Sequence, residues 1–108
     1  MPAKIKRGKK HVIVGSGPAG LFAALALAKT ENPPLVLERG KKVHERIIDV
    51  QNFWENGILN TESNVHFGEG GAGTFSDGKL TSRLKNPYTA WVKTQLVDAG
   101  APHDILID

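Results

Sequence analysis

A glycine fingerprint near the N-terminus holds the residues best suited to bind a phosphate. Gly15, Gly17 and Gly20 form a Gly-x-Gly-x-x-Gly motif directly after the apolar run Val12–Val14. At this spacing Gly15 allows a sharp turn, Gly17 leaves room for a pyrophosphate against bare backbone, and Gly20 lets a helix lie close to the strand. Pro18 fits the first turn of that helix, whose free amides face an anion. The motif predicts a dinucleotide site.

An acidic residue lies at the distance that such a site requires. Leu35–Leu37 is predicted to be a second short buried strand, and Glu38 follows it. Glu38 lies roughly 20 residues after the glycines, where an acidic side chain accepts hydrogen bonds from a ribose and disfavours the 2′-phosphate of NADP. This order of strand, glycine turn, helix, strand and acid predicts a βαβ unit. The alternative is a tight turn without a ligand and an ordinary surface glutamate.

A second glycine-rich stretch, residues 67–80, offers further donors for an anion. Five glycines fall between Gly68 and Gly78. Glycine loses the most backbone entropy on ordering, so such a loop needs a compensating interaction, and consecutive bare amides can form an anion-binding nest. Thr74 and Lys79 add side-chain donors. We expect this stretch to contact a phosphate or a polar ring edge, the alternative being a flexible surface loop.

The composition is that of a small protein without thiol chemistry. The 108 residues amount to at most one domain. The net charge of +3 comes largely from segment 1–10, which we expect to be a basic, disordered leader and not a nucleic-acid site. The absence of cysteine excludes disulfides, thiolate metal sites and thiol redox chemistry. The apolar stretch Ala19–Ala28 is too short to span a membrane, so a cytoplasmic location is expected.

Periodicity and capping residues predict three helices. They cover residues 18–30, residues 41–56 ending at Gly57, and a segment that Asn86 and Pro87 open and Gly100 ends. The second helix is expected to bury an apolar stripe and to expose its polar side. The stripe comprises Val43, Ile47, Val50 and Trp54, and the polar side His44, Glu45, Arg46 and Asp49. Residues 105–107 are expected to begin another buried element.

With both glycine stretches, the sequence resembles the N-terminal part of FAD-dependent oxidoreductases. The most similar group is a bacterial family described as FAD-dependent or NAD(FAD)-utilising dehydrogenases. The matching segments are Val12–Ala24, Leu37–Gly40 and Ser63–Leu80. The resemblance implies an α/β fold, with a Rossmann-like FAD-binding βαβ unit followed by helices and a Gly-rich loop. Because family members run to several hundred residues, residues 11–108 are expected to be the N-terminal part of an FAD/NAD(P)-binding domain, hence an incomplete domain or fragment.

The resemblance also implies a set of cofactor-binding residues. The first fingerprint would bind the pyrophosphate of FAD, and Glu38, with Arg39 beside it, would bind the adenosine ribose. The second glycine stretch would lie against the pyrophosphate, the ribitol or the flavin. Lys79 would place positive charge near the reduced flavin. The full set is Gly15, Ser16, Gly17, Pro18, Ala19, Gly20, Glu38, Arg39, Gly70, Gly71, Ala72, Gly73, Thr74 and Lys79. The cofactor is FAD, with NAD(P)H as an electron donor in a full-length form, and no catalytic residue or metal ligand is assigned.

Two other functions compete with a flavin-dependent oxidoreductase. An NAD-binding dehydrogenase domain accounts for the first fingerprint alone, but a simple nicotinamide site does not require the second glycine stretch. A non-catalytic remnant produced by truncation predicts no bound cofactor. A single parallel strand pair leaves apolar faces uncovered, so the isolated chain is expected to be marginally stable and at best a weak FAD binder.

Overall fold

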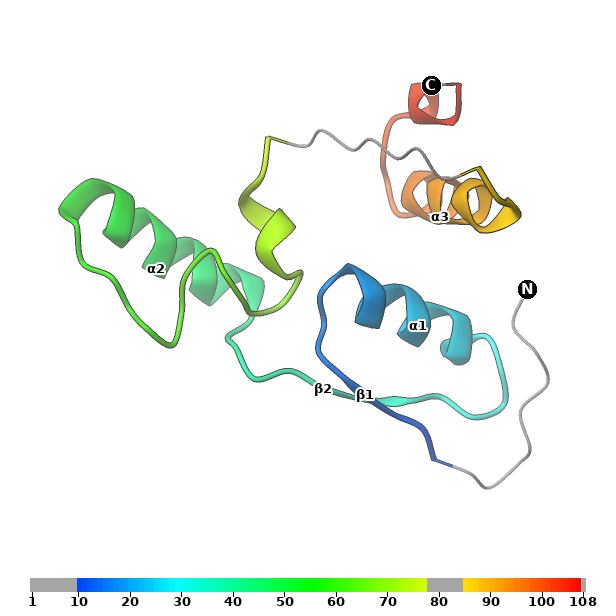
Figure 1. The fold of residues 1–108 in the computed structure, drawn as a ribbon, viewed down its shortest axis with the longest axis horizontal. Coiled ribbons are helices and arrows are strands. Elements are labelled where there is room, and N and C mark those ends of the chain that lie inside the picture. The colour runs from blue at the N-terminus through cyan, green and yellow to red at the C-terminus, as the bar shows by residue number, and fades with distance from the viewer. Residues whose placement is uncertain (1–9, 78–84, 108) are drawn as a thin grey trace. The chain divides into compact units, whose positions relative to one another are not determined.

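The structure is a computed structural model that describes residues 10–77 and 85–107 (Figure 1). The chain divides into two units, Met1–Gly78 and Lys79–Asp108, which are treated separately below. Most of the predicted basic leader and Lys79 lie outside the described residues. In the described part of the chain, no helix combines the length and apolar character needed to cross a membrane.

The first unit begins with two parallel strands joined by a helix. Strand β1 (Val12–Val14) pairs with β2 (Leu35–Leu37), with Val12 opposite Leu35. Helix α1 (Pro18–Ala28) connects them and packs on β1. β-Branched residues favour the strand, and alanine and leucine favour the helix. The predicted strand, helix and strand are confirmed, although α1 ends two residues earlier than expected.

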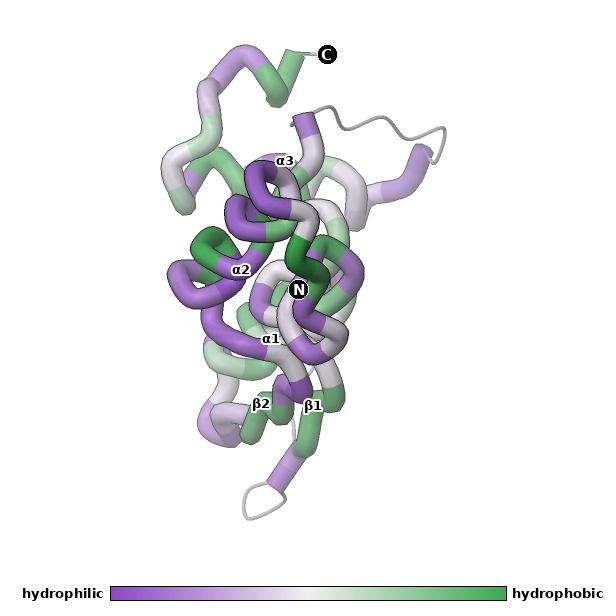
Figure 2. Tube along the Cα trace, turned by 90° about the vertical axis from the view of Figure 1, so that its left-hand side faces the viewer, coloured by the Kyte–Doolittle hydropathy of each residue, from purple (hydrophilic) through white to green (hydrophobic). Residues whose placement is uncertain are grey.

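The strand pair is covered on one face only. Ile13 and Val36 are half-buried, whereas Val12, Val14, Leu35 and Leu37 are exposed, Val14 by 85%. Figure 2 shows the hydrophobic character of both strands. Parallel sheets in proteins are normally covered on both faces. Among the described residues, no element covers the second face of this pair.

Helix α2 (Val43–Asn56) ends at Gly57, whose φ of +69° is left-handed, as predicted. The predicted division of this helix into two sides is right only in part, since His44 and Glu45 are exposed and Val50 is buried as predicted. Trp54, however, is 62% exposed, and its ring lies edge-to-face with Phe75, with centroids 6.3 Å apart. Arg46, expected to face solvent, is 0% exposed.

The path of the segment that follows α2 explains why Arg46 is buried and Trp54 is exposed. Residues 60–75 fold back along α2 against Arg46, and Val50 one turn further is buried as well, whereas Trp54, a turn beyond Val50, meets this segment at the Phe75 ring and stays mostly exposed. An antiparallel bridge between Asn60 and Ser63 starts the return. A 3-10 turn, Ala72–Phe75, ends the described part of it.

The second unit contains α3 (Pro87–Asp98). The side chain of Asn86 caps it by accepting hydrogen bonds from the amides of Tyr88 and Thr89, at 2.9 and 3.2 Å, as predicted. A 3-10 turn, His103–Leu106, follows. The prediction that residues 105–107 begin a buried element is wrong, because Ile107 is 86% exposed. Within this unit α3 packs against the 3-10 turn.

The described fold is thus a small α/β arrangement of two parallel strands and three helices.

Candidate functional site

The first glycine stretch forms the corner between β1 and α1. Gly15, with φ of +102°, turns the chain, and its amide donates to the Leu37 carbonyl at 2.7 Å. Pro18 opens α1. A methyl group at Gly20 would collide with the carbonyl oxygen of Gly15. Gly15 and Gly20 therefore have the turn and close-packing roles that their spacing predicts.

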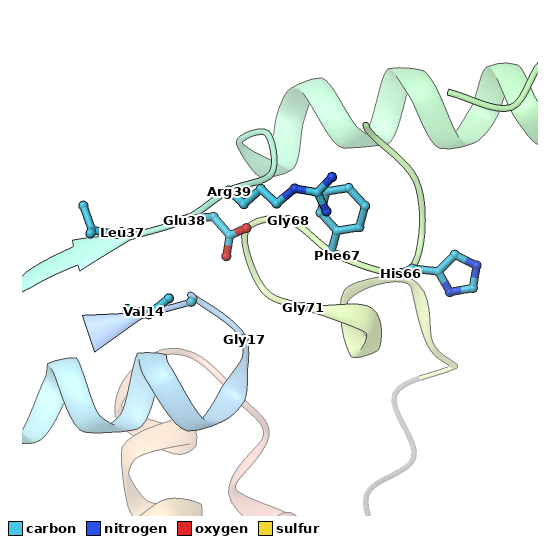
Figure 3. Close-up of a pocket in the computed structure, with 10 residues that line it drawn as sticks. Val14, Gly17, Leu37, Glu38, Arg39, His66, Phe67, Gly68 and Gly71 are labelled. Atoms are coloured by element: carbon cyan, nitrogen blue, oxygen red, sulfur yellow. The ribbon is translucent and has the colours of Figure 1, made fainter. Parts of the chain in front are cut away.

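Glu38 lies beside this corner, at the end of β2 (Figure 3). Its Oε1 accepts hydrogen bonds from the Ser16 amide at 2.8 Å and the Ser16 hydroxyl at 2.9 Å. Its Oε2 accepts one from the Gly40 amide at 2.7 Å. A carboxylate has about four lone-pair positions, so Oε2 retains one for a further donor such as a sugar hydroxyl. The part played by Ser16 was not foreseen, although a hydroxyl between the two glycines is the signal that would have indicated it.

The second glycine stretch packs directly against the first. The Gly70 amide donates to the Ser16 carbonyl at 2.8 Å. Gly71 has φ of +76°, and a Cβ there would come within 3.0 Å of the Gly17 Cα and 3.2 Å of the Pro18 ring. The backbones of the two stretches thus approach at positions where neither has a side chain, and at Gly71 the positive φ and the short contacts favour glycine.

Arg46 of α2 holds this second stretch in place. Its Nη1 donates to the carbonyls of Glu69 at 2.6 Å and Gly71 at 3.0 Å, and to the Thr74 hydroxyl at 3.2 Å. Its Nη2 donates to the Asn64 carbonyl at 2.9 Å. The guanidinium also lies 5.0 Å from the centroid of the Phe75 ring. Sequence reasoning missed Arg46, and the signal that could have revealed it is its place one turn before the buried Val50.

A groove of about 270 Å³ lies between these elements. Gly15, Gly17, Glu38, Arg39, Phe67 and Gly71 are among the residues that line it. Figure 3 shows the Arg39 guanidinium across the Phe67 ring, 4.5 Å from its centroid. Pockets for whole drug-sized ligands hold roughly 300–1,000 Å³. The groove is therefore smaller than a pocket that encloses a whole drug-sized ligand.

The other predicted site residues are distributed around this groove. Ser16 is buried and does not line the groove, and Pro18 and Ala19 are exposed at the start of α1. Ala72, Gly73 and Thr74 do not line the groove, and the Thr74 hydroxyl also donates to the Gly71 carbonyl at 3.0 Å. Lys79 lies outside the described residues. Within the described ranges, no cluster of three or more His, Cys, Asp or Glu side chains could hold a metal ion.

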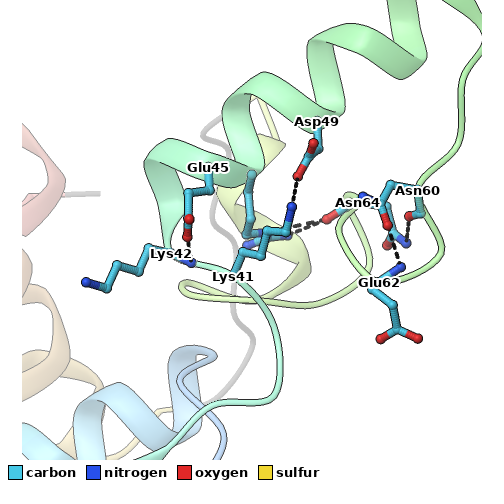
Figure 4. A network of polar contacts seen from close by, with 8 residues as sticks. Lys41, Lys42, Glu45, Asp49, Asn60, Glu62 and Asn64 are labelled. Carbon is cyan, nitrogen blue, oxygen red and sulfur yellow. Dashed lines mark hydrogen bonds and ion pairs between the residues drawn. The ribbon is translucent and has the colours of Figure 1, made fainter.

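Two carboxyl groups near the site are stabilised in their charged form. The Gly40 amide, and after it the Ser16 amide, lower the pKa of Glu38. The Ser63 hydroxyl, and after it the Lys41 ammonium, lower the pKa of Asp49. Lys41 and Asp49 form an ion pair of 2.9 Å alongside α2 (Figure 4). In each case hydrogen bonds to the anion outweigh the cost of partial burial.

These shifts predict that acid destabilises the first unit. A carboxyl whose pKa is lower in the folded than in the unfolded state stabilises the fold fully above its unfolded pKa, and this contribution is lost as pH falls through the folded pKa. We therefore expect the urea midpoint to be constant near neutral pH and to fall below about pH 4. Glu38→Gln should flatten this dependence, whereas Glu55→Gln, at an exposed position of α2, should retain it. A midpoint that does not change with pH would contradict the assignment.

The fold and site together define a small α/β unit with a glycine-lined groove at its strand-to-helix corner. No protein-family profile matches the chain. The chain is similar to an uncharacterized protein of Clostridium beijerinckii, with 56% identity over 96 residues. These residues are 89% of this chain but 18% of the length of the clostridial protein.

Proposed function

We propose that this chain is the FAD-binding portion of a flavin-dependent oxidoreductase. One observation carries the proposal: two glycine stretches far apart in the sequence meet at Gly17 and Gly71, beside the carboxylate of Glu38. Bare backbone at a helix start suits a phosphate, and a carboxylate at the end of the second strand suits a ribose. The spare lone pair on Glu38 Oε2 is consistent with this role.

The residues present fit the adenosine diphosphate part of FAD. The amides of Gly17 and Ala19 and the N-terminal end of the α1 dipole would hold the pyrophosphate, because the Gly15 and Ser16 amides already donate to Leu37 and Glu38 and Pro18 has no N–H. Glu38 would accept from the ribose, with Arg39 beside it. The negative charge of Glu38 would oppose a 2′-phosphate, and this argues against NADP at this site. FAD, when bound, supplies the hydride and electron transfer that protein side chains cannot perform.

The contact between the two glycine stretches favours FAD over NAD in this groove. A simple nicotinamide site needs only the first fingerprint, whereas here the Gly70 amide and Gly71 are built against that fingerprint. In this proposal, the substrate and the electron donor, such as NAD(P)H, are bound by other parts of a longer protein that contains this portion. The role proposed for the chain itself is to bind and orient the cofactor.

Cofactor titration of the purified protein tests this function. We expect FAD to bind, with quenching of its fluorescence and a perturbed visible absorption band, and ADP to compete with it. NAD should bind at least tenfold more weakly than FAD, and NADP more weakly still. Binding of NAD in preference to FAD would support the alternative of a nicotinamide domain, and binding of none of these nucleotides would refute the proposal.

A further inference from the structure

The buried charge of Arg46 is not neutralised by a carboxylate in contact with it. The side chain is 0% exposed, and the guanidinium donates to carbonyl oxygens and one hydroxyl. Neither the ion pair of Arg39 with Glu62 nor that of Lys41 with Asp49 involves Arg46. Burying an ion without a partner is costly, so an uncompensated charge at this place calls for an explanation beyond packing.

Arg46 sets the orientation of the peptides in the second glycine stretch. The carbonyls of Glu69 and Gly71 point toward its guanidinium. Because a trans peptide is planar, the N–H groups of the same two peptide units, which belong to Gly70 and Ala72, point the opposite way. The Gly70 amide uses this direction to reach the Ser16 carbonyl at 2.8 Å, and so joins the two glycine stretches.

The charge of Arg46 also acts on the groove itself. Gly68, which lines the groove, lies so close to the Arg46 side chain that a Cβ at this glycine would overlap its aliphatic part. The positive charge contributes to lowering the pKa of Glu38, after the larger effects of the amide hydrogen bonds. A charge with little water around it acts over a longer distance than one at the surface. The field of Arg46 therefore reaches the groove although its side chain does not line it.

We propose that Arg46 is the positioning residue that makes the groove select ligands bearing phosphate groups. Its hydrogen bonds turn the second glycine stretch toward the first, and its positive charge favours a polyanion in the groove that they form. This inference rests on the proposed function, because it assumes that the groove binds a nucleotide. It adds that phosphate recognition depends on a buried cation of α2 and not on the α1 terminus alone.

Two probes that differ only in phosphate groups test this inference. ADP and adenosine are titrated into the full chain and into three variants, and affinities are taken from amide chemical shifts, which detect millimolar binding. Arg46→Met removes the charge, Arg46→Lys keeps the charge but loses the planar fork, and Lys29→Gln removes an equal charge at the far end of α1. The titrations are repeated in trimethylamine N-oxide, which stabilises folded states, with helicity as the check on folding.

The ratio of ADP to adenosine affinity is the quantity that decides. We expect Arg46→Met to weaken ADP at least tenfold and adenosine less than threefold, so that the ratio collapses. Arg46→Lys should weaken both ligands while keeping most of the ratio, and Lys29→Gln should change neither more than twofold. Equal weakening of both ligands by Arg46→Met would show a purely structural role and overturn the inference, while leaving the proposed function intact.

Two further outcomes also decide. If the unaltered chain binds neither ADP nor FAD, the proposed function fails and the inference fails with it. If Arg46→Met does not fold even in the osmolyte, Arg46→Lys decides alone. If Arg46→Lys binds both ligands more weakly but keeps the ratio of ADP to adenosine affinity, the inference is supported. If that ratio falls although the positive charge is kept, the inference is overturned.

Discussion

Gly20→Ala is expected to destabilise the first unit by about 1–3 kcal/mol, the usual cost of forcing extra atoms into a packed site. Gly20 is the third residue of α1. Helix propensity alone would make alanine better than glycine there by about 1 kcal/mol. The added methyl group, however, would collide with the carbonyl oxygen of Gly15, which belongs to the backbone of the turn and cannot move without opening it. Because of this close approach, we expect Gly20→Ala to destabilise the unit, although helix propensity alone predicts that it stabilises the unit.

Gly17→Ala, three residues earlier, is the matched control for this effect. A Cβ at Gly17 meets only the Gly71 Cα at an ordinary 3.8 Å, and the φ of −75° suits alanine. We expect its urea midpoint to stay close to that of the unaltered chain. Its affinity for ADP should nevertheless fall at least tenfold, because the methyl group fills the room left for phosphate. Equal stability of Gly20→Ala and the unaltered chain would contradict the packing of the corner.

Glu38→Ala is expected to lower FAD affinity at least tenfold. Hydrogen bonds to a charged group are typically worth about 1.5–3 kcal/mol, and roughly 1.4 kcal/mol corresponds to a factor of ten. The variant removes the proposed acceptor for the ribose and also the anchor of Ser16 and Gly40. Glu55→Gln, at an exposed carboxylate of α2, should change the affinity less than twofold.

A sugar analogue separates the two roles of Glu38. We expect 2′,3′-dideoxy-ADP to bind the unaltered chain more weakly than ADP does, because Glu38 then lacks a hydroxyl donor. In Glu38→Ala the two nucleotides should bind about equally. If Glu38→Ala leaves FAD affinity within twofold, or if the preference for ADP over its dideoxy analogue persists in the variant, the ribose assignment is wrong.

The corner between β1 and α1 could be predicted because its signals are local. The run Val12–Val14, the glycine spacing and Pro18 each specify the conformation of a few neighbouring residues, and together they agree with the observed corner. The role of Glu38 was predicted from its place after the second strand, roughly 20 residues beyond the glycines. That Ser16 would donate two hydrogen bonds to this carboxylate was not foreseeable from spacing.

The parts that could not be predicted depend on contacts between distant segments. Helical periodicity places Arg46 near Val50, but it does not say which side of α2 a later loop will cover, so Arg46 was assigned to solvent and Trp54 to the core. The close approach of Gly40 to Gly68 could not be predicted either. A Cβ at Gly40 would overlap the Gly68 backbone, and no local sequence pattern indicates this contact. Only the three-dimensional path of residues 60–75 reveals both.

Amide chemical-shift mapping during titration with FAD tests most directly whether two glycine turns share one nucleotide. The account predicts that the amides of residues 15–20 and 68–72 shift together along a single binding curve, while those of 85–107 stay in place. Shifts in only one of the two glycine stretches, shifts confined to residues 85–107, or no shifts at millimolar FAD would contradict it.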